Sequence, residues 1–118
     1  DLRLAIGGEL FVESAEALTG GWIRLADGEP ADGLALVAMT DAWPPAAFTR
    51  VATRMAAPTV DLTVHVRRPD PAPDGWFLVV FRTTLAADGY LEEDGQLWSE
   101  DGRLLAQSRQ LALAAPFR

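Results

Sequence analysis

A strict alternation of apolar and polar residues runs through residues 59–68. Side chains two positions apart in a strand point to the same face, so this pattern predicts a half-buried β-strand. One face consists of Val60, Leu62, Val64 and Val66, and the other of Thr59, Asp61, Thr63, His65 and Arg67. Residues 76–81 are continuously apolar and rich in aromatic and β-branched side chains, which favours a central strand.

Further strands are predicted on both sides of these two. Residues 90–98 and 104–113 flank an Asp-Gly pair that is typical of a β-hairpin turn, and residues 22–25 form a short strand candidate. Residues 69–75 are rich in Pro, Asp and Gly, and we interpret them as a long hairpin connection, not a domain boundary. Gly95 indicates either a bulge or a close approach of two backbones.

One helix is predicted before the strands. Residues 34–39 are apolar on every side, Asp32 is placed to cap their first turn, and Pro44 and Pro45 end the segment. A helix of about ten residues that is apolar all round is expected to be buried on all sides. A short second helix is predicted over residues 46–55.

A buried helix followed by consecutive strands predicts an α+β fold in which an antiparallel sheet curls round the helix. We expect residues 20–118 to form this domain. Residues 1–19 have no firm period, and they fit a linker, an edge strand or the remnant of an upstream domain. A sheet with one covered face also leaves room for a partner.

The amino-acid composition narrows the classes of function that the chain can have. The chain has 118 residues and a net charge of −7, and its longest basic cluster is the pair Arg67–Arg68, which disfavours nucleic-acid binding. It has no cysteine and one histidine, which excludes disulfides, thiolate chemistry and multi-histidine metal sites. It contains no apolar run of membrane-spanning length and no recognisable leader, so we expect a cytoplasmic location and no membrane span.

Asp41 is a candidate catalytic residue because a carboxylate at the C-terminal end of a helix is electrostatically disfavoured. Apolar neighbours would raise its pKa and make it a better proton acceptor. The alternative is an exposed aspartate in a turn before proline.

Thr59 and Gln110 are candidates for orienting a water molecule, since a hydroxyl and an amide both donate and accept hydrogen bonds. Alternatively, Thr59 is an ordinary strand residue and Gln110 faces solvent. His65 lies on the polar strand face and is a poor candidate for a catalytic base. Arg67 and Arg68 suit an anionic ligand, and the alternative is that they pair with Asp70 and Asp74, which follow closely.

The acidic residues near the last two strands are interpreted as a solvated face. They are Asp88, Glu92, Glu93, Asp94, Glu100 and Asp101.

Four segments together carry a family resemblance: GWIRL (21–25), DAWPP (41–45), TVDLTVHVRRP (59–69) and GRLLAQSRQ (102–110). In this order and spacing they resemble the C-terminal half of the acyl-CoA thioesterase II family, the double-hotdog thioesterases.

The resemblance implies a hotdog fold and hydrolysis of fatty acyl-CoA to free fatty acid and CoA, without a cofactor. In the family an Asp, a Thr and a Gln hold and activate the attacking water, and they match Asp41, Thr59 and Gln110. The resemblance also implies a second hotdog half, supplied by the same precursor, a separate chain or a homodimer, and residues 1–19 would be a linker or a remnant of it.

Two other functions remain open. A non-catalytic hotdog that binds acyl-CoA or acts as a scaffold would conserve the fold without turnover. A hotdog hydratase fits less well, because it requires an Asp and a His near each other at the helix, and His65 lies far along a strand.

Overall fold

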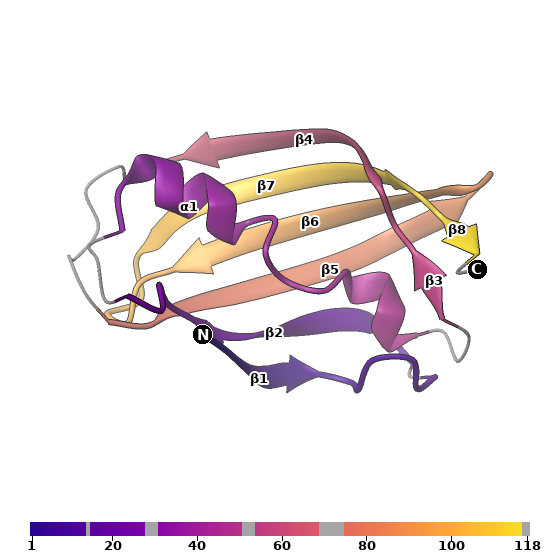
Figure 1. Ribbon diagram of the computed structural model, residues 1–118, viewed down its shortest axis with the longest axis horizontal. Coiled ribbons are helices and arrows are strands. Elements are labelled where there is room, and N and C mark those ends of the chain that lie inside the picture. The colour runs from indigo at the N-terminus through magenta and orange to yellow at the C-terminus, as the bar shows by residue number, and fades with distance from the viewer. Residues whose placement is uncertain (14, 28–30, 51–53, 69–74, 117–118) are drawn as a thin grey trace.

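The computed structural model describes residues 1–118 apart from 14, 28–30, 51–53, 69–74 and 117–118. This part of the chain contains a six-stranded antiparallel sheet with the spatial order β1-β2-β5-β6-β7-β4. Its strands are β1 (Leu2–Gly7), β2 (Ala17–Ile23), β4 (Thr59–Val66), β5 (Phe77–Ala87), β6 (Tyr90–Trp98) and β7 (Leu104–Leu113). Helix α1 (Gly33–Met39) lies across one face of the sheet (Figure 1), which confirms the predicted α+β layout.

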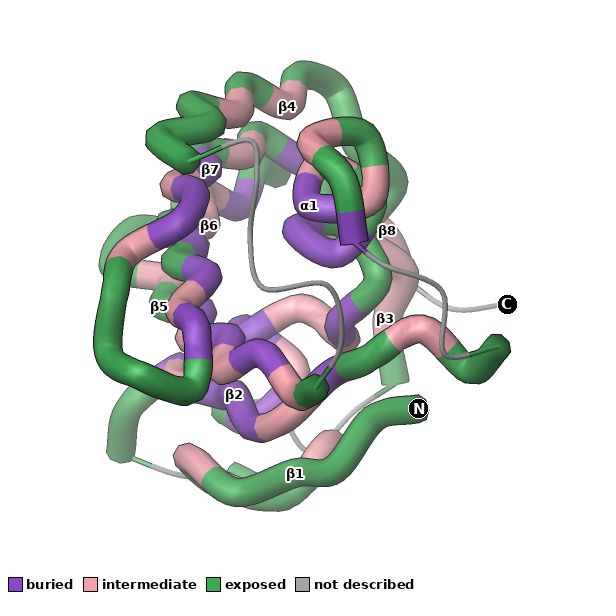
Figure 2. Tube along the Cα trace, turned by 90° about the vertical axis from the view of Figure 1, so that its left-hand side faces the viewer, coloured by how far each residue is buried: buried purple, intermediate pink, exposed green. Residues whose placement is uncertain are grey.

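Helix α1 begins as predicted but is shorter and more exposed. The Asp32 carboxylate accepts a hydrogen bond from the Ala35 amide at 2.8 Å and caps the first turn. The helix has seven residues, and the prediction of burial on all sides is wrong. Leu36 and Met39 are buried toward the sheet, whereas Leu34 is 79% exposed. Buried and exposed stretches both occur along α1 (Figure 2). The sheet lies against one side of the helix, and Leu34 and Ala38 are exposed on the other.

The chain then crosses to the opposite end of the sheet. A 3-10 helix, η1 (Ala46–Thr49), is followed by strand β3 (Met55–Ala56), which pairs with β8 (Ala115–Pro116). The predicted helix over residues 46–55 is therefore present as one 3-10 turn and does not reach Met55, which pairs with another strand. Residues 51–53 lie outside the described residues. No helix in the described ranges is long and apolar enough to cross a bilayer.

Most strand predictions are confirmed. Strands β6 and β7 have the predicted bounds, and the Ser99 amide donates to the Arg103 carbonyl across the predicted hairpin turn. Strand β5 begins within the predicted segment and continues to Ala87, and β2 includes only the first two residues of the predicted strand 22–25. Most of the predicted loop 69–75 lies outside the described residues.

Residues 2–7 form an edge strand of the same sheet. Strand β1 pairs antiparallel with β2, with Leu2 opposite Ile23 and Gly7 opposite Thr19. Of the three interpretations of residues 1–19, the structure therefore shows the edge strand in this part. An edge strand that is exposed along most of its length needs no apolar period, which is why the pattern left it open.

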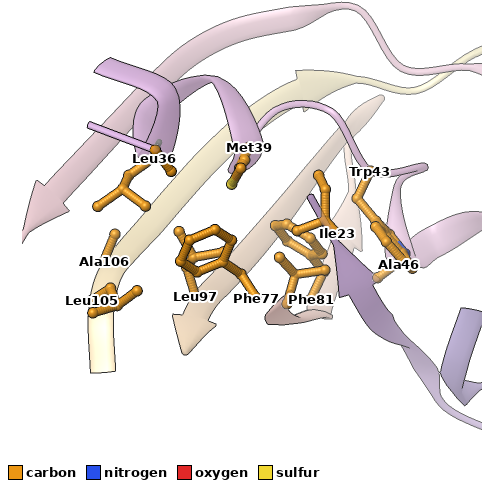
Figure 3. Close-up of a cluster of buried hydrophobic side chains, with 12 residues drawn as sticks. Ile23, Leu36, Met39, Trp43, Ala46, Phe77, Phe81, Leu97, Leu105 and Ala106 are labelled. Atoms are coloured by element: carbon orange, nitrogen blue, oxygen red, sulfur yellow. The ribbon is translucent and has the colours of Figure 1, made fainter. Parts of the chain in front are cut away.

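The main hydrophobic core lies between α1 and the sheet (Figure 3). It is built from large side chains, among them Leu36, Met39, Phe77, Phe81, Leu97 and Leu105. Gly95 permits this packing, because a Cβ atom there would lie 2.3 Å from Ser108 Oγ and 2.6 Å from Phe81 Cε1. The crowding at Gly95 thus comes from two side chains and not from the predicted close approach of backbones, and no register shift occurs at that residue.

Candidate functional site

The start of β4 is irregular, and this irregularity orients Thr59. Leu62 pairs with Gln110, whereas Thr59 pairs with Ala112, so three steps along β4 match only two along β7. The extra residue, Val60, makes a β-bulge, which turns the preceding side chain to the other face of the sheet. Thr59 therefore lies with Gln110 on the inner face of the sheet, which is the face that α1 covers. Simple alternation predicts the opposite, polar face for Thr59.

Thr59 and Gln110 meet in the structure. The Gln110 Nε2 atom donates a hydrogen bond to Thr59 Oγ1, joining residues 51 positions apart in the sequence. Gln110 is half-buried, which contradicts the alternative in which it simply faces solvent. The bond uses one of the two amide hydrogens of Gln110 and leaves the Thr59 hydroxyl hydrogen available to another acceptor.

Asp41 lies just after α1, as predicted, and its amide donates to the Ala38 carbonyl at 3.2 Å. Its side chain is exposed and has no hydrogen bond or ion pair with Thr59, Gln110 or any other described residue. Its negative charge nevertheless contributes to raising the pKa of Glu93. Asp41 therefore acts on the site through its electric field in this structure.

The connection that carries Asp41 is held by Trp43. The indole Nε1 of Trp43 donates to Thr19 Oγ1 at 3.0 Å, and both side chains are buried in the sheet's inner face. A buried aromatic ring with a satisfied N–H fixes a loop more firmly than apolar packing alone. The path from α1 to η1 is therefore anchored two residues after Asp41.

A small pocket lies beside Gln110 on the inner face. It is lined by Pro45, Ala57, Thr83, Leu91, Glu93, Gln110 and Ala112. Its enclosed space is about 10 Å³, close to the least that a single water molecule requires. The pocket combines three polar side chains with small apolar ones, so it suits one water more than a bulky group.

Glu93 is the residue that the sequence interpretation missed. It was assigned to a solvated acidic face, and the structure shows that this is wrong. Glu93 Oε2 accepts a hydrogen bond from the Ala46 amide at 2.6 Å, and burial raises the pKa of the carboxyl to about 7. The signal was present, since Glu93 has the same parity along the strand as the buried Leu91 and Leu97.

The other members of the acidic group behave as expected or form surface ion pairs. Glu92 and Asp94 contact Arg109 on the outer face of the sheet, and Asp101 pairs with Arg103 at 3.0 Å. Hydrogen bonding from the Ser99 hydroxyl lowers the pKa of Asp101. Within the described ranges, no three side chains gather as they would around a metal ion.

His65 and the arginine pair lie away from this pocket. His65 is exposed and pairs in register with Gln107, as its place on the polar face predicts. Arg67 and Arg68 border a surface hollow together with Arg103. The hollow is basic, as an anion-binding surface would be, but no described contact links it to the pocket.

The sequence model of the acyl-CoA thioesterase C-terminal domain matches residues 1–114. No curated protein matches the chain. Two solved structures share about a third of its residues. A conserved protein of unknown function with a hot dog fold, from Alicyclobacillus acidocaldarius, is 34% identical, with a TM-score of 0.86 over 98% of this chain and 45% of that one.

The second, named putative thioesterase II from Thermobifida fusca YX, is 35% identical, with a TM-score of 0.75 over 88% of this chain and 40% of that one. The chain thus spans less than half the length of both structures. At 9% identity, the smu.793 protein of Streptococcus mutans UA159, solved with acetyl CoA bound, shares the fold with a TM-score of 0.75, covering 100% of this chain and 91% of that one. The predicted hotdog fold is confirmed.

Proposed function

The chain belongs to the family of acyl-CoA thioesterase C-terminal domains, and we propose that it hydrolyses fatty acyl-CoA to free fatty acid and CoA. The observation that carries the proposal is the meeting of Thr59 and Gln110 beside a pocket of single-water size. The hydroxyl and the amide orient the water toward the thioester carbon. Asp41 acts as its base or as the negative charge that anchors it.

This arrangement supports direct attack by water. A covalent acyl-enzyme requires an activated nucleophile, and none of Asp41, Thr59 and Gln110 is paired with a histidine or lysine that would activate it. The reaction needs no cofactor. We place it in the lipid metabolism of the cytoplasm, where acyl-CoA esters are the substrates.

A second hotdog half completes the site in this proposal. The chain covers 45% and 40% of the two similar structures, and the outer side of α1 exposes Leu34. Edge strand β4 likewise exposes Val60, at 55%, beside the bulge. A second half from the same precursor, a separate chain or a second copy would cover these apolar groups and shape the acyl tunnel.

The competing function is a hotdog that binds acyl-CoA or acts as a scaffold without hydrolysing it. The exposed, unpaired Asp41 side chain favours this alternative, since a water-activating base is usually held in place. The smu.793 structure supports only the point that this fold accommodates a CoA thioester.

Substitution of Asp41 by alanine tests the proposal. In the intact protein, thiol release from acyl-CoAs of several chain lengths should be abolished in Asp41→Ala, while thermal unfolding stays unchanged. The control is Asp101→Ala, which removes an exposed carboxylate at the β6–β7 turn, away from the pocket, and should keep most of the activity. Unchanged turnover in Asp41→Ala refutes the role of Asp41. Acyl-CoA binding without CoA release by the unsubstituted protein favours the non-catalytic alternative.

A further inference from the structure

A second carboxylate faces the site from the sheet itself. Glu93 lies on β6 directly opposite Gln110 of β7, and both side chains line the small pocket. Cross-strand partners on one face bring their side chains within contact distance. Glu93 is therefore nearer to the orienting amide than the exposed Asp41, which does not line the pocket.

One oxygen of Glu93 is fixed by the backbone. The Ala46 amide at the start of η1 donates to Oε2 at 2.6 Å, and this bond favours the charged form of the carboxyl. Burial has the larger and opposite effect, so the pKa rises from 4.5 to about 7. A carboxyl in this range exchanges its proton near neutral pH, as a general base requires.

The pocket contains a further polar group that points to a ligand. The Thr83 Oγ1 atom is buried and has no hydrogen-bond partner among the described residues, although Thr83 lines the pocket beside Glu93. Buried hydroxyls are nearly always satisfied, and a water held in the pocket would satisfy this one. Glu93, Gln110 and Thr83 thus surround the same small space from three neighbouring strands.

The two charges that act on the pKa of Glu93 are both negative. Asp41, from the α1–η1 connection, and Asp94, its neighbour on β6, both raise its pKa. Arg109 pairs with acidic residues on the outer face, and Arg82 is exposed opposite Asp94. Strand β3, helix η1 and the inner face of β4 carry no titratable side chain. No cation in these elements competes for Glu93.

We propose that Glu93 is the general base of the proposed thioester hydrolysis, taking the proton of a water held beside Gln110 and Thr83, and that Asp41 contributes only as a nearby negative charge. The assignment rests on the proposed function. As an O–H bond of the water breaks, its proton passes to the Glu93 carboxylate and its oxygen bonds to the thioester carbon. The C–S bond then breaks, and the departing thiolate takes the proton from Glu93, which restores the carboxylate.

A purely structural role for Glu93 as the cap of η1 makes a different prediction. Glutamine keeps an oxygen that accepts the Ala46 N–H, so Glu93→Gln preserves the cap but cannot accept a proton. Glu92→Gln is the matched control: it makes the same chemical change one residue away, on the outer face. If only Glu93→Gln loses activity, and its thermal stability at low pH equals that of the unsubstituted protein, Glu93 acts as a base and not merely as a cap.

The experiment measures kcat/KM for acyl-CoA hydrolysis against pH in the intact protein and in both variants. The unsubstituted protein should lose activity below about pH 7, as Glu93 becomes protonated. Glu93→Gln should lower kcat/KM at least about 100-fold and abolish this acidic limb, while Glu92→Gln retains both. If Glu93→Gln hydrolyses acyl-CoA at the rate of the unsubstituted protein and still loses activity at acidic pH, Glu93 is not the base. The proposed hydrolysis itself would still stand.

A titration that does not depend on turnover provides the second arm. Infrared difference spectroscopy should show one carboxyl titrating near pH 7, and its midpoint should move to lower pH in Asp41→Asn, which removes a nearby negative charge. If the titration midpoint is the same in Asp41→Asn as in the unsubstituted protein, the charge of Asp41 does not act on Glu93. This test holds even if Glu93→Gln fails to fold. Absence of thiol release by the unsubstituted protein overturns the proposed function and the base assignment together.

Discussion

The two halves of the sheet's inner face differ in the size and polarity of the side chains that pack on them. Under α1, large buried side chains such as Phe77, Phe81 and Leu97 form one apolar cluster (Figure 3). Near η1, the buried cluster consists of Ala47, Leu91 and Ala112, with polar side chains between them. One sheet thus supports a dense apolar core at one end and a polar pocket at the other.

The difference shows how a small fold makes room for chemistry. Small residues leave a space, and the polar groups that line it must be satisfied by each other or by a ligand. Burial in this pocket opposes the negative charge of Glu93 and therefore raises its pKa. Stability comes mainly from the α1 half, and reactivity is expected from the η1 half.

Two leucines on the inner face of β6 test this contrast most strongly. Leu97, 0% exposed, belongs to the large core, and Leu91, 6% exposed, lines the pocket. Leu97→Ala should reduce the free energy of unfolding by about 3–5 kcal/mol and Leu91→Ala by about 2–3 kcal/mol, because water can enter the opened pocket. Urea denaturation measures both. Equal losses would show that the two halves are packed alike.

The pH dependence of stability probes the pocket half with a smaller effect. Because the folded pKa of Glu93 lies near 7, above its unfolded value of 4.5, this group stabilises the fold below pH 4.5 and loses that contribution as the pH rises through 7. Glu93→Gln should remove the loss, a change of roughly 1–3 kcal/mol between pH 4 and pH 8 relative to the unsubstituted protein.

Denaturation curves of Glu92→Gln provide the comparison for that measurement. Glu92 pairs with Arg109 on the outer face, so this variant should keep the pH dependence of the parent. A parent protein whose stability rises between pH 5 and pH 7 would contradict the burial of Glu93.

The smallest expected effect concerns the two helix starts. Asp32 caps α1 from the adjacent residue, whereas Glu93 reaches η1 from a distant strand. Asp32→Ala should cost about 1 kcal/mol, the usual value for a lost N-cap, and leave the pH profile of activity unchanged. Calorimetry and the thiol-release assay together check this, and an altered pH profile would mean that the two halves are coupled through α1.

Local patterns predicted the elements whose signals are local. The Asp32 cap, the hairpin turn and strands β6 and β7 each follow from neighbouring residues, and all are confirmed. The predicted helix does not reach Met55, because pairing of Met55 with β8 overrides any helical preference there. Glu93 shares the inward parity of Leu91 and Leu97, but its acidic neighbours favour a solvated face, so local composition and strand parity predict opposite environments for it.

For the candidate site, the family resemblance identified Thr59 and Gln110, and the folded structure brings their side chains into contact. Nothing near Thr59 in the sequence marks the bulge at Val60, and without it the Thr59 side chain would lie on the opposite face from Gln110. The predicted catalytic role of Asp41 stays a proposal, because its side chain is exposed and only its charge reaches the pocket.

Period, turn residues and caps act over a few neighbouring positions, so the amino-acid sequence alone predicts where most of the strands form and where the capped helix begins. The face to which Thr59 turns, the burial that raises the pKa of Glu93 to about 7, and the gathering of Thr83, Glu93 and Gln110 around one space arise only in the folded chain. These properties depend on strand register and on desolvation by residues far away in the chain, and a local sequence pattern contains neither.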